Sequence, residues 1–379
     1  MASGGVEMSL KASPSRPCPE RIDQVIPAII EHDAVSNHTF EAQRLLRSLG
    51  FASEIYARII GPGCDGRVRE LSELPRLGAE RQWVLYQHSI GSPAAEVFAE
   101  HPGGKLLDYH NVTPAPLVER WLPPLGDEAR LGRAQLSLLA PLVPLALADS
   151  EFNAAELRAA GFARADVVPV LIETGNVEAP PDPGALARLR GAKANGGADW
   201  LFVGQVAPHK AQHDLVTAFA CYRKAYDPAA RLHLVGREMG HAYRAAVARY
   251  VEALELEEAV SLPGSVPQGV LAAHYAAADV FVCCSDHEGF CAPIVEAMHR
   301  RLPVVAYGAG AVPETVGAGG LVLEEKDPPL VAAAVHEVLA SNALRAKLVA
   351  QGERQAARYS LEGARRRFVE VIETALALR

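Results

Sequence analysis

The chain has 379 residues, more than one ordinary hydrophobic core sustains, so its length predicts two domains. Apolar residues make up 49% of the sequence and charged residues 22%, proportions that are typical of a globular protein. The net charge of −8 argues against a broad nucleic-acid surface, and no apolar run is long enough to span a membrane.

Residues 1–20 are rich in Ser, Pro and Gly and lack an apolar segment, which predicts a disordered N-terminus rather than a secretory signal. The six cysteines show neither C-x-x-C pairs nor the spacing of a disulfide framework. Free thiols in a reducing compartment are the simplest explanation. We therefore expect a cytoplasmic protein.

The first predicted domain covers residues 21–173 and opens with a strand, a loop, a helix and a second strand. The strand covers residues 24–30, although Pro27 removes one donor from its ladder. Leucines and Ala42 recur at helical spacing until Gly50, and the second strand covers residues 51–57. This order predicts a doubly wound parallel sheet.

Polar residues follow the predicted strands of this domain. Ser36 and Asn37 lie in the loop after the first strand, and His88 and His110 follow two later strands. Doubly wound sheets bind ligands at the carboxyl ends of their strands, so these positions are candidate ligand contacts. Ordinary turn residues and structural histidines explain the same positions equally simply.

Prolines and glycines concentrate in residues 174–197, which we interpret as a linker around one short helix. The second predicted domain, residues 198–358, starts with an apolar strand followed by Gly204 and, six residues later, Lys210. Glycine permits close backbone approach and lysine supplies a point charge, so this loop suits phosphate binding. The spacing of a P-loop is absent.

A second loop of this domain carries two carboxylates. After the apolar run 279–284 comes Glu288, and Pro293 predicts a helix that contains Glu296. The amino end of this helix offers N–H groups and partial positive charge to an anion such as a diphosphate. The carboxylates would repel phosphate and suit hydroxyls or developing positive charge. Alternatively, Glu288 caps the helix and Glu296 is solvated.

The last part of the chain adds a small-residue loop and a terminal helix. Gly308-Ala309-Gly310 resembles half of a dinucleotide fingerprint, but Pro313 occupies the place of the third glycine, so we reject a nicotinamide site. The helix within residues 359–379 is amphipathic. Its arginines 365–367 are interpreted as a solvated face, with weak membrane-surface association as the alternative.

The segment Glu288-Gly-Phe-x-x-Pro-x-x-Glu296-Ala closely resembles the E-x7-E motif of family 4 retaining glycosyltransferases. The segments around His88 and His110 resemble the N-terminal domains of bacterial members. The resemblance implies the GT-B fold, in which two Rossmann-like doubly wound domains face each other across a cleft. It also implies that the C-terminal helix crosses back to the N-terminal domain.

The activity that this resemblance implies is transfer of a sugar, with retention, from a nucleotide-diphosphate sugar to a hydroxyl acceptor. The acceptor would be a glycan, a lipid-linked glycan or a small molecule. No further cofactor is expected. No metal site is expected either, since the His and Asp residues lack ligand spacing.

The resemblance also implies roles for individual residues. Glu288 would contact the donor sugar, Glu296 the ribose, and His110 would lie near the anomeric carbon, with His88 as second choice. The acceptor-side candidates are Ser36, Asn37, His88 and Asn111. The donor-binding candidates, besides Glu296, are Gly204, Gln205, Lys210, Gly236, Gly289, Phe290, Cys291 and Ala292.

One position departs from the family pattern. Gln205 stands where an arginine is expected beside the donor diphosphate, which removes one positive charge. Two alternatives therefore stay open. The first is a nucleotide-sugar epimerase of GT-B architecture, and the second is a catalytically weakened partner subunit that binds the nucleotide sugar. The sequence leaves the base, the sugar, the acceptor and the oligomeric state open.

Overall fold

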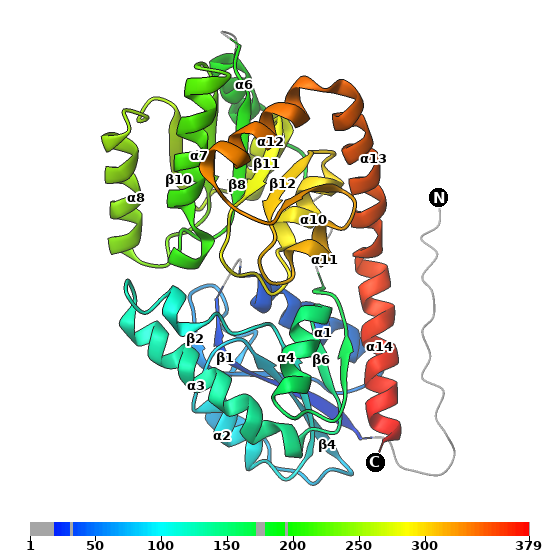
Figure 1. Ribbon diagram of the computed structural model, residues 1–379. Helices are drawn as coiled ribbons and strands as arrows, with labels where there is room; N and C mark the ends of the chain where they lie inside the picture. Colours follow the sequence, from blue (N-terminus) through cyan, green and yellow to red (C-terminus); the bar gives the residue numbers. More distant parts are fainter. Residues whose placement is uncertain (1–18, 31–32, 172–178, 194–195, 379) are drawn as a thin grey trace. The chain divides into compact units, whose positions relative to one another are not determined.

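The computed structural model describes residues 19–30, 33–171, 179–193 and 196–378 (Figure 1). The predicted disordered N-terminus, except residues 19–20, and part of the predicted linker lie outside these residues. The chain divides into two compact units. The first unit contains residues up to Val112, Glu128–Ile172 and the segment from Leu361, and the second contains Thr113–Asp127 and Glu173–Ser360.

The first unit is built on a parallel sheet of seven strands in the order β3-β2-β1-β4-β5-β6-β7. The strands are β1 (Arg21–Ile29), β2 (Ile55–Ile60), β3 (Arg69–Glu70), β4 (Gln82–His88), β5 (Gly104–Tyr109), β6 (Ala146–Ala148) and β7 (Ala165–Val167). Its helical elements are α1 (Ala34–Ser48), η1 (Leu71–Glu73), α2 (Ala94–Ala99), η3 (Ala140–Leu142), α4 (Glu151–Ala159), α14 (Leu361–Ala377) and, from Glu128 on, α3 (Pro123–Leu139).

Local sequence explains where these elements begin and end. The Asp33 carboxylate accepts from the backbone N–H groups of Val35 and Ser36 and so caps α1. Gly50, with φ of +91°, follows the end of that helix. The predicted second strand begins four residues later than expected, at Ile55, because Phe51 is buried in the core and Ala52 makes only an isolated bridge to Arg21.

Pro27 is accommodated inside β1, a central strand. The register of β1 with β4 ends at the Val25–Tyr86 pair, while the register with β2 continues to Ile29. Odd-numbered positions such as Arg21 direct their N–H groups to the β4 side, and even-numbered positions such as Gln24 to the β2 side. The missing N–H of Pro27 therefore falls where β4 no longer pairs, and the strand prediction is confirmed.

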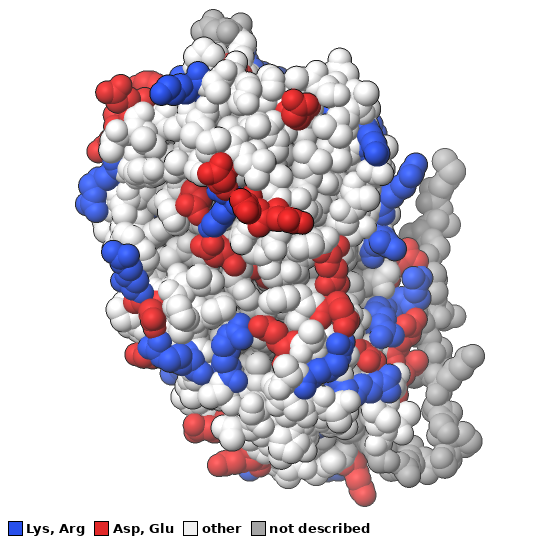
Figure 2. Space-filling view, viewed as in Figure 1, with Lys and Arg blue, Asp and Glu red and all other residues white. Residues whose placement is uncertain are grey.

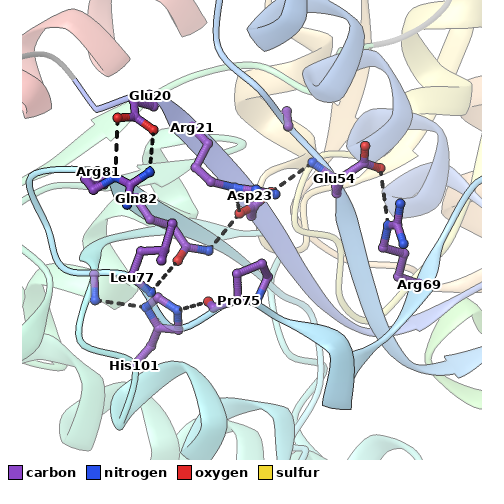
Figure 3. Close-up of polar contacts among 12 residues, drawn as sticks. Glu20, Arg21, Asp23, Glu54, Arg69, Pro75, Leu77, Arg81, Gln82 and His101 are labelled. Carbon is purple, nitrogen blue, oxygen red and sulfur yellow. Dashed lines mark hydrogen bonds and ion pairs between the residues drawn. The ribbon is translucent and has the colours of Figure 1, made fainter.

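A polar network occupies the amino ends of β1, β2 and β4 (Figure 3). The Asp23 side chain is fully buried and accepts from Arg21 Nε at 2.6 Å, from Gln82 Nε2 at 2.7 Å and from the Glu54 backbone N–H at 3.0 Å. Its charge is thus neutralised and hydrogen-bonded. This end of the sheet is closed by structural contacts, which leaves the carboxyl end for ligands.

The terminal helix α14 packs into the core of the first unit. Phe368, Val371 and Ile372 are fully buried in one cluster with residues of β1, β4 and β5. Arg365 Nε donates to the buried Glu41 carboxylate at 2.6 Å, and Arg367 donates to the Val167 carbonyl at 3.1 Å. The side chains of Arg365 and Arg367 keep exposed fractions of 40% and 42%, so the predicted solvated face is confirmed, although each of these two arginines also bonds a group of the first unit.

The second unit contains a parallel sheet of six strands in the order β10-β9-β8-β11-β12-β13. The strands are β8 (Asp199–Val203), β9 (Arg231–Val235), β10 (Val260–Gly264), β11 (Val280–Cys283), β12 (Val304–Tyr307) and β13 (Gly320–Leu323). Its helical elements are η2 (Ala115–Leu117), α6 (Pro183–Ala192), η4 (Pro208–Lys210), α7 (Gln212–Ala225), α8 (His241–Ala253), α9 (Gln268–Ala277), α10 (Ala292–His299), α11 (Val312–Val316), α12 (Pro328–Ala340) and α13 (Asn342–Arg358).

Two parallel sheets, each with helices between its strands, confirm the predicted doubly wound α/β class. Among the described residues, the helices are too short or too polar to cross a bilayer. On the face drawn in Figure 2, lysine and arginine side chains are interspersed with acidic ones. Such mixing on this face does not resemble the basic stripe of a nucleic-acid-binding surface.

Candidate functional site

The backbone approaches closely at the carboxyl ends of β8 and β9. Gly204 follows β8 and donates its N–H to the Val235 carbonyl at 3.0 Å, and Gly236 follows β9. A Cβ atom added at Gly236 would lie 2.0 Å from the Gly204 carbonyl oxygen. Only glycine fits there, so these two predicted donor-binding residues lie side by side.

The loop after β11 leads into α10 with an unusual cap. Cys291 is the N-cap residue and has a left-handed backbone, with φ of 69°, and its side chain makes no cap hydrogen bond. Pro293 is the second residue of the helix. The alternative in which Glu288 caps this helix is therefore wrong. The amino end of α10 keeps its partial positive charge without a side-chain cap, as an anion site requires.

Glu288 points to a cation from a distant segment. Its Oε2 accepts from Lys210 Nζ at 2.7 Å, and both side chains are largely buried. Burial lowers the pKa of Lys210, but the carboxylate of Glu288 outweighs this, so the net shift of the pKa is upward. Lys210 is thus a firmly charged ammonium group at the site.

The loop after β12 holds the backbone of Glu288 in place. The Ala311 N–H donates to the Glu288 carbonyl at 2.9 Å. A Cβ atom added at Gly310, whose φ is +58°, would lie 2.3 Å from that carbonyl oxygen. Close packing of two loops therefore explains the Gly308-Ala309-Gly310 sequence, and this explanation needs no dinucleotide.

Glu296 is partly buried and hydrogen-bonded, which does not favour the alternative of a solvated side chain. It lies in α10 and accepts a hydrogen bond from the Tyr275 hydroxyl of α9 at 2.8 Å. Burial raises the pKa of Glu296, and the Tyr275 hydrogen bond partly opposes this shift. Sequence reasoning did not include Tyr275 among the candidate site residues.

Two thiols lie beside Glu288. Cys283 ends β11 and Cys291 caps α10, and both are buried. One ligand atom from each of Cys283, Glu288 and Cys291 lies within 4.8 Å of the others. The hydrogen bond to Cys283, together with burial, raises the pKa of Cys291 well above its ordinary value. The expectation of no metal site, which rested on His and Asp spacing, overlooked this group and also His38, Asp108 and His110, whose ligand atoms likewise lie within 4.8 Å of one another.

No replacement for the missing arginine comes from His209. This residue precedes Lys210, is buried, and has no hydrogen-bond partner at Nδ1. Burial lowers the pKa of His209 well below its ordinary value, and the charges of Lys210 and His287 add smaller shifts in the same direction. His209 is therefore neutral at physiological pH and does not restore the charge that Gln205 lacks.

In the first unit, His110 belongs to a chain of oriented amides. Gln24 Nε2 donates to the Thr39 carbonyl, so Gln24 Oε1 accepts from Gln87 Nε2, and Gln87 Oε1 accepts from His110 Nε2. His110 Nδ1 donates to the Asp149 carboxylate at 3.0 Å. Both nitrogens thus carry protons. Burial lowers the pKa of His110, but Asp149 and Asp108 raise it to a net value of about 9.

The neighbouring His38 is held in one tautomer. Its Nδ1 accepts from the Leu171 N–H at 3.1 Å, so Nε2 carries the proton and donates to Asp108 Oδ2 at 2.9 Å. The rings of His38 and His110 meet edge to face, with centroids 4.8 Å apart. Both histidines therefore belong to one buried polar network at the carboxyl ends of β1 and β5.

The acceptor-side candidates are mostly engaged in structural contacts. Ser36 Oγ accepts from the Ile30 N–H at 3.0 Å, and Asn111 donates to Asn153 and to Glu156 at 2.8 Å each. His88 is buried with Nε2 at 3.0 Å from the Gly132 carbonyl, and burial lowers its pKa to about 4. Asn37 is partly exposed near the start of α1. No contact with a ligand tests these four predictions.

Residues 185–355 match the family model described as "Glycosyl transferases group 1". The chain is 34% identical over 190 residues to D-inositol 3-phosphate glycosyltransferase of Geodermatophilus obscurus, covering 48% of this chain and 41% of that protein. It is also 34% identical over 169 residues to the GDP-mannose-dependent alpha-(1-6)-phosphatidylinositol monomannoside mannosyltransferase of Mycobacterium tuberculosis, covering 42% and 43%. Each match thus spans less than half the length of the relative.

Solved structures resemble the whole chain. Alr3699/HepE of Anabaena, crystallised with UDP and glucose, superposes with a TM-score of 0.73 at 16% identity, covering 92% of this chain and 98% of that one. WaaG, a glycosyltransferase involved in lipopolysaccharide biosynthesis, superposes with a TM-score of 0.69 at 13% identity, covering 93% and 99%. These likenesses confirm the GT-B fold.

Proposed function

We propose that this chain, whose residues 185–355 match the model of glycosyl transferases group 1, is a retaining glycosyltransferase of that family. It would move a sugar from a nucleotide-diphosphate sugar to a hydroxyl group of a glycan, a lipid-linked glycan or a small molecule. The observation that carries this proposal is the Lys210–Glu288 pair beside the uncapped amino end of α10. A cation, oriented amides and a carboxylate are the groups that a departing diphosphate and a sugar require.

The diphosphate would lie against Lys210, the backbone at Gly204 and the amides of residues 289–292. When the bond between the sugar and the diphosphate breaks, negative charge grows on the departing phosphate oxygen, and Lys210 and the helix end would stabilise it. Lys210 now bonds Glu288, so the donor phosphate would have to share this ammonium group. The pair thereby orients Lys210 before the donor arrives.

The two carboxylates would bind the remainder of the donor. Glu288 would accept a hydrogen bond from a sugar hydroxyl and would stabilise positive charge as the glycosidic bond breaks. Glu296, oriented by Tyr275, would accept from the ribose hydroxyls. The acceptor hydroxyl would attack the face that the diphosphate leaves and would give its proton to the departing phosphate, so no covalent nucleophile is assigned.

Residues of the first unit would complete the site. His110 is proposed to line the reacting face. Its two N–H groups bond Asp149 and Gln87, so it would act through its positive charge and its fixed position. Ser36, Asn37, His88 and Asn111 stay acceptor-side proposals, and the cleft between the domains stays a prediction as well.

The test is a screen of nucleotide sugars with analysis of product stereochemistry by nuclear magnetic resonance. The relatives and solved structures have names that include GDP-mannose and UDP, so GDP-mannose and UDP-glucose are the first donors to try. An α-linked product from an α-linked donor is expected. A β-linked product, or no turnover of any donor that binds, would contradict the proposal. Conversion of the donor without acceptor would indicate the epimerase alternative.

A second function is favoured by the charge at the diphosphate site. Gln205 lacks the expected cation, and the buried His209 is neutral, which weakens diphosphate binding. A nucleotide-sugar-binding partner subunit with little activity of its own would show this feature. Calorimetric titration with nucleoside diphosphates measures binding directly. Gln205→Arg should tighten it about tenfold, as one added charge contact predicts, and transfer that appears only in this variant would support the partner-subunit reading.

A further inference from the structure

We propose that Cys283, Cys291 and Glu288 form a binding site for a divalent cation of the zinc class, inside the predicted donor site. The three side chains come from the end of β11, the start of α10 and the loop between them. They are buried, with exposed fractions of 0%, 8% and 5% respectively. Thiolate sulfur and carboxylate oxygen are common zinc ligands. Magnesium and calcium instead favour sites made of oxygen ligands.

The distances suit one ion. Zinc bonds sulfur at about 2.3 Å, so two sulfur atoms on a tetrahedral ion lie about 3.8 Å apart. The three ligand atoms here all lie within 4.8 Å of one another. Small side-chain rotations would therefore suffice, and water would take the fourth position.

The charges balance when the ion binds. Two thiols each release a proton on binding, which leaves two thiolates and the Glu288 carboxylate to face the ion and the Lys210 ammonium. Three negative charges then meet three positive ones, so the buried group is neutral as a whole. Lys210 bonds one carboxylate oxygen at 2.7 Å, and the Ser285 hydroxyl lies 3.3 Å from Cys283 Sγ. These contacts would orient two of the three ligands.

The ion would act on the donor site. It would hold the carboxylate that the proposed function assigns to the donor sugar, and it would fix the loop whose amides face the diphosphate. Zinc and nucleotide sugar should therefore compete, an expectation that rests on the proposed function. The metal site itself does not rest on the proposed function, because metal binding can be measured without any nucleotide.

The experiment titrates the metal-free full-length chain with Co²⁺ and then with Zn²⁺, in the absence of nucleotide. One Co²⁺ per chain is expected, with the charge-transfer absorption of cobalt bonded to thiolate, and Zn²⁺ should displace it. Cys283→Ala and Cys291→Ala should each weaken binding at least about 100-fold, since a ligand is lost. Cys284→Ala, at the adjacent buried position, and Cys221→Ala, on α7, should leave binding unchanged.

X-ray absorption of the zinc-loaded unmodified chain keeps the proposal testable if the variants do not fold. Two sulfur ligands at about 2.3 Å are expected. A site with no sulfur ligand, binding that survives the double substitution Cys283→Ala and Cys291→Ala, or no binding to the unmodified chain would each overturn the proposal. An intact zinc site in a chain that, when metal-free, turns over none of the nucleotide sugars that it binds would instead reject only the proposed function.

Discussion

At the scale of single residues, Glu288 joins several contacts at the candidate site. It bonds Lys210, lies beside two thiols, and has its carbonyl held by the loop after β12. The contacts with Lys210 and with the loop after β12 join segments that are distant in sequence. A substitution that keeps the shape of Glu288 and removes its charge therefore tests the proposed chemistry most directly.

We expect Glu288→Gln to lower kcat by about 100-fold or more, because the amide neither stabilises positive charge on the sugar nor orients Lys210. Steady-state kinetics measure the effect, and thermal unfolding checks that the variant folds. Glu353→Gln, at an exposed ion pair with Arg301, is the matched control. A loss within a few-fold would show that the role assigned to Glu288 is wrong.

The pKa of His110 predicts how stability depends on pH. A histidine whose pKa is about 9 when folded and about 6.5 when unfolded stabilises the protein fully below about pH 6.5. This contribution is lost as the pH rises through about 9, and the difference corresponds to roughly 3 kcal/mol. Asp149, Asp108 and Asp33 are the carboxylates that favour its charge.

Urea unfolding of the chain and of His110→Gln, between about pH 6 and pH 9.5, measures this contribution. The unmodified chain should lose more unfolding free energy than the variant over this range, since glutamine does not titrate. Equal slopes for both proteins would mean that the proton on His110 does not stabilise the fold.

At the scale of elements, the close contact between the loop after β12 and the loop before α10 controls the site. A side chain at Gly310 would collide with the Glu288 carbonyl and push the loop that carries Glu288 away from Lys210. The effect should therefore appear in activity as well as in stability. Some glycines with positive φ, such as Gly66, have no atom near an added Cβ, so backbone strain and collision are separable.

We expect Gly310→Ala to lower kcat/KM at least about tenfold, beyond the roughly 1 kcal/mol of stability that a positive φ costs alanine. Gly66→Ala, where φ is +75° and no atom lies within 4 Å of an added Cβ, is the control for strain alone. Kinetics together with urea unfolding distinguish the two variants. If both substitutions left kcat/KM unchanged, the collision at Glu288 would have no catalytic consequence.

At the scale of the whole molecule, the chain returns to its first unit after completing the second. The last helix, α14, supplies fully buried side chains to the cluster that contains residues of β1 and β4. The stability of the first unit therefore depends on residues more than two hundred positions away in sequence. This dependence arises because the burial of apolar side chains of α14 stabilises the first unit.

Phe368 tests that dependence, because its side chain is fully buried in this cluster. Phe368→Ala should lower the free energy of unfolding of the first unit by about 3–5 kcal/mol, through lost transfer energy and the cavity that remains. Glu370→Ala, at an exposed position of the same helix, should change it by less than about 0.5 kcal/mol. Urea unfolding followed by circular dichroism measures both. A small loss for Phe368→Ala would mean that α14 contributes little to this core.

Local patterns in the sequence determined the order of strands and helices, the doubly wound class and the E-x7-E loop, because hydrophobic period, caps and glycines act within a few residues. The tertiary structure alone decided that Lys210 meets Glu288, that Tyr275 meets Glu296, and that Cys283 lies near Cys291. It also decided that Arg365, which stays partly exposed, binds the buried Glu41 carboxylate. Such contacts depend on which strands become neighbours and on how their loops pack. No local pattern in the sequence encodes which of these side chains meet.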